Sequence, residues 1–437
     1  MAEGPRGLIV AAPATGQGKT TLTLGLIAAL RARGIKVGAV KIGPDFIDPG
    51  FHIAAGAAAS FNLDHWGMRP ALRAALVAEA GAGNALVLGE GMMGLFDGAP
   101  GGGGSTADIA AETGWPVILA IDAGAQAQSV AALAQGFARF RPDVAVAGVV
   151  LTKVGGAPHR KLLADALAAA GLRVFGMLGH DTGLALPERH LGLVQAREQK
   201  LDALIARAAS VVAAEIDLDA LLAAAAPARA GPASPPAAQN PTFGRRIAVA
   251  DDAAFAFAYA HLLGGWRAAG AEILRFAPLA DEAPPADCDA VYLPGGYPEL
   301  HAARLAAARK FRDDMYAAAV RGAAIYGECG GYMVLGQTLT DAKGVPHPML
   351  GLLPVATSFA RPELHIGYRT LALIGETPLG PAGTRFRGHE FHFSSVVTEA
   401  ESVRLFAVGD ADGTALGHAG LRRGTVFGSY LHLIDAA

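Results

Sequence analysis

Residues 6–20 read RGLIVAAPATGQGKT, and this stretch decides the fold of the N-terminal half. Residues 7–12 are an apolar run typical of a buried strand. A glycine-rich turn follows, and Leu22, Leu26 and Leu30 then repeat at helical spacing until Gly34. The order strand, glycine-rich turn, helix is typical of a phosphate-binding loop, because glycines let successive backbone N–H groups face one phosphate.

The polar residues of this turn predict a nucleotide site. Lys19 can reach terminal phosphates, and the Thr20 hydroxyl can bind Mg²⁺. Pro13 replaces the first glycine of the usual pattern, so the alternative is a turn that only connects two elements. Lys41, in the next apolar run, would add positive charge unless it is solvated. We expect ATP to contact Gly16, Gly18, Lys19, Thr20, Thr21 and Lys41.

Acidic residues follow two further apolar runs. Asp45 and Asp48 come after residues 36–42, and Glu90 and Asp97 come after residues 85–89. Because ligands bind at the carboxyl ends of strands in a parallel sheet, these side chains should face the same crevice as the loop. We expect Thr20, Asp45 and Glu90 to hold Mg²⁺. The alternative for the aspartates is an ordinary turn beside proline or glycine.

The length of 437 residues predicts two or three domains. Residues 116–122 and 144–152 add apolar runs between helical stretches, which indicates a parallel sheet covered by helices. Residues 208–243 are alanine-rich and then proline-rich, and strand-like runs resume at 247–250, 289–293 and 323–326. We predict an α/β fold: an ATP-binding synthetase domain at 1–200, a helix and proline-rich linker at 201–243, and a second α/β domain at 244–437.

The composition excludes several protein classes. A net charge of -3 gives no attraction for polyanions, so we expect no nucleic-acid binding. No apolar run nears the roughly 18 residues that a membrane span needs, and we expect a cytoplasmic protein; a homodimer is allowed for. Two cysteines without a C-x-x-C pattern argue against a disulfide framework or a zinc cluster.

Residues 323–333 read AAIYGECGGYM, an apolar strand that turns at Cys329. Small residues around a turn let a nucleophile project at a helix N-terminus, where positive potential would lower the thiol pKa. We expect His432 to serve as its acid and base, and an oxyanion hole formed by Gly295, Gly296 and Gly330. Cys288 is expected to be a packing residue.

Residues 389–392 read HEFH, which invites a metal-site interpretation. The two histidines are three residues apart instead of the four of a zinc-protease helix, and the sequence suggests no third ligand. A loop facing the substrate, or ordinary packing, is the preferred interpretation.

Together these segments resemble the cobyrinic and hydrogenobyrinic acid a,c-diamide synthase family over nearly the whole chain. The similarity rests on the phosphate loop, residues 41–49, 90–98 and 187–193, and on a C-terminal half similar to class I glutamine amidotransferases. The resemblance implies a dethiobiotin-synthetase-like first domain, ATP and L-glutamine as co-substrates, and a small-molecule corrinoid substrate amidated through an acyl phosphate. It also implies substrate and phosphate handling by Asp48 and Asp97.

Two departures from relatives leave questions open. No glutamate follows His432 in an H-x-E pattern, because Leu433, Ile434 and Asp435 come next, so the group that orients the imidazole is unknown. Residues 152–154 read TKV where related enzymes often carry an asparagine for base recognition.

Two other functions compete with the corrinoid ligase. One is a nickel sirohydrochlorin a,c-diamide synthase. The chain uses alanine, glycine, arginine and proline heavily, which is typical of GC-rich bacterial genomes and favours hydrogenobyrinate as the substrate. The other is a partitioning or switch ATPase with an inactive amidotransferase-like module. Ala14 argues against it, because partitioning ATPases carry a signature lysine there.

Overall fold

A computed structural model describes residues 4–437 except 187, 190–191, 199–200, 230–241 and 401–402. The described residues form two compact units. The first contains the described residues up to Trp66 and from Pro70 to Arg229, and the second contains Gly67–Arg69 and the described residues from Thr242 onward.

The first unit is built on a parallel sheet with the strand order β3-β2-β4-β1-β5-β6-β7, and β10 pairs antiparallel with β1. Its strands are β1 (Arg6–Ala11), β2 (Val37–Ile42), β3 (Ser60–Leu63), β4 (Leu86–Gly91), β5 (Val117–Asp122), β6 (Val146–Val154), β7 (Val174–Gly179) and β10 (Ala226–Pro227). Its helices are α1 (Lys19–Ala32), α2 (Asp48–Ala55), α3 (Pro70–Gly81), α4 (Thr106–Thr113), α5 (Ser129–Phe140), α6 (Ala157–Ala169), α7 (Asp202–Glu215) and α8 (Leu218–Ala224).

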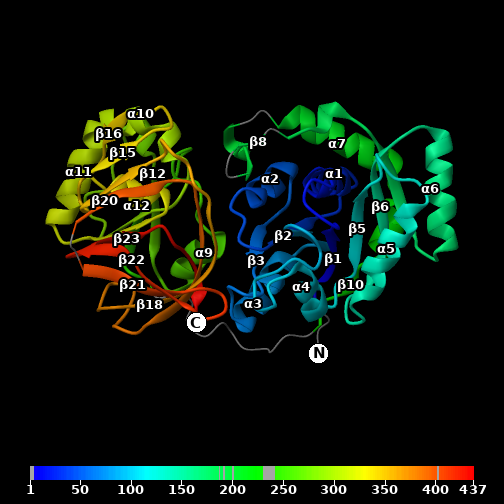
Figure 1. The fold of residues 1–437 in the computed structure, drawn as a ribbon, viewed down its shortest axis with the longest axis horizontal. Helices are drawn as coiled ribbons and strands as arrows, with labels where there is room; N and C mark the ends of the chain where they lie inside the picture. Colours follow the sequence, from blue (N-terminus) through cyan, green and yellow to red (C-terminus); the bar gives the residue numbers. More distant parts are fainter. Residues whose placement is uncertain (1–3, 187, 190–191, 199–200, 230–241, 401–402) are drawn as a thin grey trace. The chain divides into compact units, whose positions relative to one another are not determined.

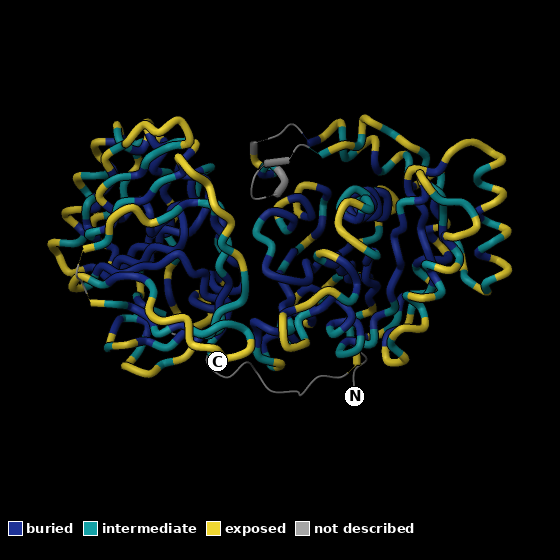
Figure 2. The backbone as a smooth tube through the Cα atoms, viewed as in Figure 1, coloured by how far each residue is buried: buried dark blue, intermediate teal, exposed yellow. Residues whose placement is uncertain are grey.

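Helices cover both faces of this sheet, with α1, α2 and α7 on one side and α3 and α4 on the other (Figure 1). Strands covered on both faces are mostly apolar, and every residue of β2 and β4 is buried, including the charged Lys41 and Glu90 near their carboxyl ends. Figure 2 shows this buried centre, whereas α6 at the edge carries many exposed residues. The predicted parallel sheet with flanking helices is confirmed.

The helical part of the predicted linker lies inside the first unit. Helix α7 packs against α1 so closely that a Cβ atom on Gly25 would lie 2.6 Å from Val212 Cγ2 and 2.9 Å from the Ala208 carbonyl oxygen. The short strand β10 then pairs with β1. The sequence places these residues between domains because alanine-rich helices carry little sign of their packing partner. The proline-rich residues 231–236 lie outside the described residues.

The second unit has a mixed sheet with the order β12-β11-β13-β14-β23-β22-β21-β18-β19-β24. Its strands are β11 (Arg246–Ala250), β12 (Glu272–Phe276), β13 (Ala290–Leu293), β14 (Ala324–Glu328), β18 (His365–Leu373), β19 (Arg385–His392), β21 (Val403–Gly409), β22 (Ala415–Arg423), β23 (Val426–Ser429) and β24 (His432–Ala436). The first five strands of this order, β12-β11-β13-β14-β23, pair in parallel. The remaining neighbours, from β23-β22 to β19-β24, pair antiparallel (Figure 1).

A smaller sheet of this unit has the order β16-β15-β17-β20. Its strands are β15 (Thr338–Thr340), β16 (Pro346–Pro348), β17 (Val355–Ser358) and β20 (Ser395–Glu399), and the helices of the unit are α9 (Ala260–Ala268), α10 (Ala302–Ala307), α11 (Arg309–Val320) and α12 (Gly330–Leu335). In the first unit, β8 (Glu188–Arg189) and β9 (Gly192–Leu193) form a short ribbon within the 187–193 motif, of which residues 187, 190 and 191 lie outside the described part of the chain.

Among the described residues, no helix combines the length and the apolar character that crossing a lipid bilayer would require.

The contact between α1 and α7 can be tested at Gly25. Gly25→Val should lower the stability of the first unit by about 1–3 kcal/mol, because the added methyl groups overlap Val212 and the α7 backbone. The matched control is Gly136→Ala in α5, where a Cβ atom meets nothing within 4 Å. This substitution should raise the stability of the first unit by about 0.4–1 kcal/mol. Urea unfolding followed by circular dichroism measures both. Equal stability of the two variants would contradict the packing of α7 on α1.

Candidate active sites

The phosphate loop holds its lysine against backbone oxygens. Gly16 and Gly18 have φ angles of 81° and 86°, the left-handed conformation that glycine adopts without strain, and α1 begins at Lys19. The Lys19 ammonium donates to the Ala14 carbonyl at 3.2 Å and to the Met93 carbonyl at 2.7 Å. Burial, and then Lys41, lower its pKa to about 8. The ammonium therefore lies between the loop and the residues after β4, where phosphate oxygens could replace the two carbonyls.

Thr152 braces the same loop. Its hydroxyl donates to the Gln17 carbonyl at 3.1 Å, and its Cγ2 atom lies 3.5 Å from where a Cβ atom of Gly18 would stand. Lys153 instead forms an ion pair with Asp122 at 2.6 Å. Within residues 152–154, Thr152 thus supports the loop.

Glu90, at the end of β4, gathers a hydroxyl, an ammonium and an imidazole in the buried interior. Its Oε1 accepts from the Thr20 hydroxyl at 2.6 Å and from the Lys41 ammonium at 3.0 Å, and His52 Nε2 lies 2.9 Å from its Oε2. Burial would raise the pKa of Glu90, but Lys41, His52 and Thr20 outweigh it and hold that pKa below its usual range. Glu90 therefore stays ionised beside Thr20.

His52 is a member of this site that the sequence analysis missed. It is fully buried in α2, and its other ring nitrogen lies 3.0 Å from the Ser60 hydroxyl. A lone histidine in the run FHIAAG carries no local signal. Its role depends on β2, β3 and β4 lying side by side, which only the fold reveals.

Lys41 and Asp48 form a buried ion pair with each other. They are 3% and 4% exposed, so the structure places both away from solvent. Burial would lower the pKa of Lys41, but Asp48 and Glu90 raise it above its usual range. The direct contacts expected of Lys41 with ATP and of Asp48 with substrate remain predictions, whereas the structure shows that Lys41 donates to Glu90.

Asp45 and Asp97 use one carboxylate oxygen each to close their own turns. Asp45 Oδ1 accepts from the Ile47 and Asp48 backbone N–H groups at 2.7 and 3.0 Å, and Asp97 Oδ2 accepts from the Gly94 N–H at 2.8 Å. Both contacts agree with the alternative interpretation of these residues as turn formers.

The Thr21 hydroxyl donates to the Leu184 carbonyl at 3.4 Å, whereas its neighbour Thr20 faces Glu90.

Cys329 lies at a sharp turn between β14 and α12. Its backbone has φ 46° and ψ -105°, a strained conformation that a backbone bond from its N–H to the Ser429 carbonyl at 2.8 Å helps to hold. Glycines are required on both sides, because a Cβ atom on Gly327 would lie 2.6 Å from Leu335 Cδ1 and one on Gly331 would overlap the Leu293 carbonyl oxygen. Crowding by neighbouring strands thus explains the small residues of this elbow.

The backbone at Gly295 lies beside both Cys329 and His432. A Cβ atom on Gly295 would lie 3.3 Å from Cys329 Cβ and 3.2 Å from His432 Nε2. His432 is 1% exposed and is the first residue of β24. The structure therefore brings together the thiol and the imidazole that the sequence paired.

The glycines of the predicted oxyanion hole also meet at this point. A Cβ atom on Gly330 would stand 3.1 Å from the backbone nitrogen of Gly296, and the Gly330 N–H interacts with the Cys329 sulfur. The backbones of Gly295, Gly296 and Gly330 thus lie close together beside Cys329. Their role in stabilising an oxyanion remains a prediction.

The expected lowering of the Cys329 pKa is wrong for this structure. The thiol is buried, and burial raises its pKa most; Glu299 raises it further, and Glu328 and Glu390 add to this. Helix α12 has six residues, so its dipole is short, and only the Gly330 N–H opposes the shift. The free chain therefore holds Cys329 as a thiol that needs a base.

Asp435, the first carboxylate after His432, faces away from the imidazole. Its Oδ2 accepts from Arg69 N and Nε at 2.8 and 2.9 Å, and its Oδ1 accepts from Arg69 Nη2 at 2.8 Å. Both carboxylate oxygens of Asp435 are therefore bound by Arg69, which belongs to the same unit.

The HEFH segment gains a third potential ligand in the structure. His365, Glu390 and His392 have donor atoms within 4.8 Å of one another, a grouping that the sequence does not suggest and that does not contain His389. Arg369, however, binds the Glu390 carboxylate through Nε at 2.8 Å and Nη2 at 2.7 Å. His392 Nδ1 also contacts the Ser394 carbonyl at 2.9 Å. These contacts agree with a packing role.

Comparison with known proteins gives full-length relatives and two domain families. Residues 8–194 match the CobQ/CobB/MinD/ParA nucleotide binding domain, and residues 246–437 match the CobB/CobQ-like glutamine amidotransferase domain. A Brucella suis protein named hydrogenobyrinate a,c-diamide synthase is 54% identical over 98% of both chains. Proteins with the same name from a Sinorhizobium species and from Mesorhizobium japonicum are 52% and 48% identical over 99% of both chains.

The raised pKa of Cys329 predicts how the thiol reacts with iodoacetamide. In a Cys288→Ala background, the alkylation rate should climb about tenfold per pH unit from pH 7 to 9 without a plateau, because only the thiolate reacts. Glu299→Gln should speed the reaction at each pH, since it removes the carboxylate that raises the pKa most. Mass spectrometry of the labelled peptide gives the rates. A plateau below about pH 8, the sign of a lowered pKa, would contradict this.

Proposed function

The chain belongs to the hydrogenobyrinate a,c-diamide synthase family, and we propose on this premise that it amidates the a and c acetate carboxylates of hydrogenobyrinate in cobalamin biosynthesis. It is a glutamine-hydrolysing ligase that uses ATP. The observation that carries the proposal is that one chain holds both a Lys19–Thr20–Glu90 phosphate site and a Cys329–His432 pair.

The first unit supplies the activation step. Gly16 and Gly18 leave the loop open to phosphate, and the Lys19 ammonium is within reach of carbonyl oxygens that phosphate oxygens can replace. ATP transfers its terminal phosphoryl group to the substrate carboxylate, which gives an acyl phosphate and ADP. Ammonia then attacks the acyl carbon, and phosphate leaves.

Mg²⁺ fits the oxygen donors of this site. The Thr20 hydroxyl and the Glu90 carboxylate meet at 2.6 Å, and Glu90 stays ionised. Hydroxyl and carboxylate oxygens are the ligands that Mg²⁺ prefers. Thr20 and Glu90 would hold the ion, with Asp45 as the further predicted ligand, and the ion would neutralise phosphate charge. Lys41 and His52 keep the Glu90 carboxylate charged and oriented.

The second unit supplies ammonia. His432 takes the proton of the Cys329 thiol, and the sulfur attacks the side-chain amide carbon of glutamine. His432 returns the proton to the leaving ammonia, and water then cleaves the thioester to give glutamate and the free thiol. The N–H groups of Gly295, Gly296 and Gly330 stabilise the oxyanion that forms at each step.

The preferred substrate is hydrogenobyrinate, because the relatives that span the chain carry that name. Nickel sirohydrochlorin is not favoured by these relatives, and neither is a partitioning ATPase. Mass spectrometry after incubation with ATP, glutamine and each tetrapyrrole tests the choice. Two successive conversions of carboxylate to amide on hydrogenobyrinate are expected, and no amidation of any corrinoid would refute the proposal.

The remaining assignments complete the proposal. The synthetase domain comprises residues 1–200 together with the helices that follow, and the amidotransferase domain comprises residues 244–437. Asp48 and Asp97 handle substrate and phosphate. The protein works in the cytoplasm, without nucleic acid, as a monomer or homodimer.

Cys329→Ala should abolish glutamine-dependent amidation, by at least about 1,000-fold in kcat, because the nucleophile is lost. Ammonium chloride should still support amidation, since the first unit keeps its phosphate site. Cys288→Ala is the control and should retain both activities. A Cys329→Ala chain inactive with ammonium as well would show a structural role for this cysteine.

Lys19→Ala should reduce amidation by at least about 100-fold with either nitrogen source, because the ammonium stabilises the transferring phosphoryl group. The matched control is Lys161→Ala, which removes an exposed lysine of α6. ADP release and diamide formation are measured together. Unchanged ATP-dependent turnover of the Lys19 variant would refute the phosphate-loop assignment.

A further inference from the structure

The thiol-imidazole pair needs a group that orients the imidazole, and the residue next to the nucleophile has the geometry for this role. Glu328 Oε2 lies 3.5 Å from His432 Nδ1, and both side chains are 1% exposed. We propose that Glu328 is the positioning residue of His432, acting as the third member of the glutaminase site. This inference rests on the glutaminase function proposed above.

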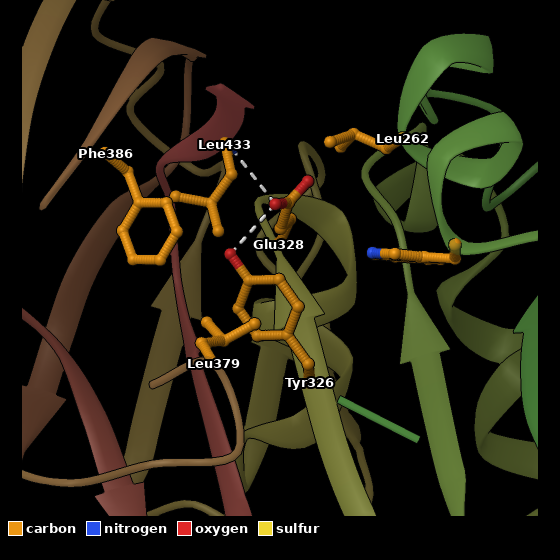
Figure 3. Close-up of a pocket in the computed structure, with 7 residues that line it drawn as sticks. Leu262, Tyr326, Glu328, Leu379, Phe386 and Leu433 are labelled. Carbon is orange, nitrogen blue, oxygen red and sulfur yellow. Dashed lines mark hydrogen bonds between the residues drawn. The ribbon is translucent and has the colours of Figure 1, made fainter. Parts of the chain in front are cut away.

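The carboxylate of Glu328 is held by donors on both oxygens. The Tyr292 hydroxyl donates to Oε2 at 2.6 Å, and the Tyr326 hydroxyl donates to Oε1 at 2.8 Å. The backbone N–H of Leu433 donates to Oε1 at 3.0 Å. Figure 3 shows the last two of these bonds meeting at one carboxylate oxygen, beside Leu262, Leu379 and Phe386. Glu328 is thus fixed in an apolar surround.

The tyrosines serve as permanent donors. Burial, and then the Glu328 charge, raise the pKa of Tyr292 and of Tyr326 well above the usual range, so both phenols keep their protons. The pair stacks with ring centroids 5.8 Å apart, which limits rotation of either ring. Each phenol donates to the Glu328 carboxyl group, whose oxygens have further lone pairs that can accept from an imidazole N–H.

The chain connects Glu328 to both reacting residues. It precedes Cys329 directly, at the end of β14, and it binds the N–H of the residue that follows His432. A carboxylate on Nδ1 fixes the tautomer with Nε2 available to the thiol and stabilises the imidazolium that forms. His432 Nε2 is the ring nitrogen that lies near Gly295 and, beyond it, Cys329.

Other groups near His432 do not provide this acceptor. Asp435 is bound by Arg69 and by the Ala436 N–H at 2.9 Å. His389 of β19 faces the imidazole as its pairing partner, and burial, followed by His432, lowers its pKa to about 3. A neutral His389 does not repel the imidazolium. Glu390 is bound by Arg369 through Nε at 2.8 Å and lies 3.1 Å from His392 Nε2.

Glu328→Gln tests the assignment, with Asp435→Asn as the matched loss of a buried carboxylate. Glutamine-dependent and ammonium-dependent amidation are measured in the full-length chain, with the melting temperature. The Gln variant should lose about 100- to 10,000-fold in kcat with glutamine, with little change in KM for glutamine and full activity with ammonium. Asp435→Asn should retain kcat with glutamine.

Glu328→Asp keeps the charge at a shorter reach and should recover part of the kcat lost in the Gln variant. Because its charge is unchanged, it also tests the role if the Gln variant fails to fold. A Gln variant within threefold of the parent kcat would overturn the proposal. So would an Asp variant, melting like the parent, that recovers nothing, or a loss of kcat in Asp435→Asn instead. A parent chain without glutaminase activity would overturn the function itself, and this inference with it.

Discussion

Glu90 and Glu328 are carboxylates removed from water at the carboxyl ends of parallel strands, with 0% and 1% exposure. An ionised carboxylate in an apolar interior costs several kcal/mol unless charges and hydrogen bonds compensate. Lys41, His52 and Thr20 contact the Glu90 carboxylate. Two tyrosine hydroxyls and a backbone N–H donate hydrogen bonds to Glu328. The residues around each acid are therefore constrained by its burial. Each acid lies beside one functional side chain: Thr20 in one unit and His432 in the other.

Close packing of the backbone brings Cys329 and His432 of the second unit beside Gly295. The strand ends of the second unit approach so closely that side chains at Gly295, Gly327 and Gly331 would collide with neighbours. The same crowding leaves the thiol dry, which explains why its pKa is raised and why it requires a base. In the first unit, glycines at positive φ keep the loop open to a ligand while Thr152 supports it from behind.

The sequence predicts the parts of this structure that are local. The strand, loop and helix around Lys19 and the strand and turn around Cys329 follow from short patterns, and both appear where expected. The contacts that His52 and Glu328 make with distant segments are not predicted. His52 reaches Glu90 and Glu328 reaches His432 only through sheet pairing. Asp45 and Asp97 have carboxylates that could bind a ligand, yet each accepts a hydrogen bond from a backbone N–H of its own turn. The packing of α7 on α1 at Gly25 is not predicted either, because an alanine-rich helix does not reveal its packing partner.

The two sites serve one reaction if nitrogen released at Cys329 enters the product activated at Lys19. Product formed from hydrogenobyrinate, ATP and glutamine labelled with ¹⁵N at the side-chain amide tests this directly by mass spectrometry. The account predicts a diamide that carries two ¹⁵N atoms, with two ADP released per diamide. A diamide without ¹⁵N, or labelled ammonia released without any amidated product, would contradict it.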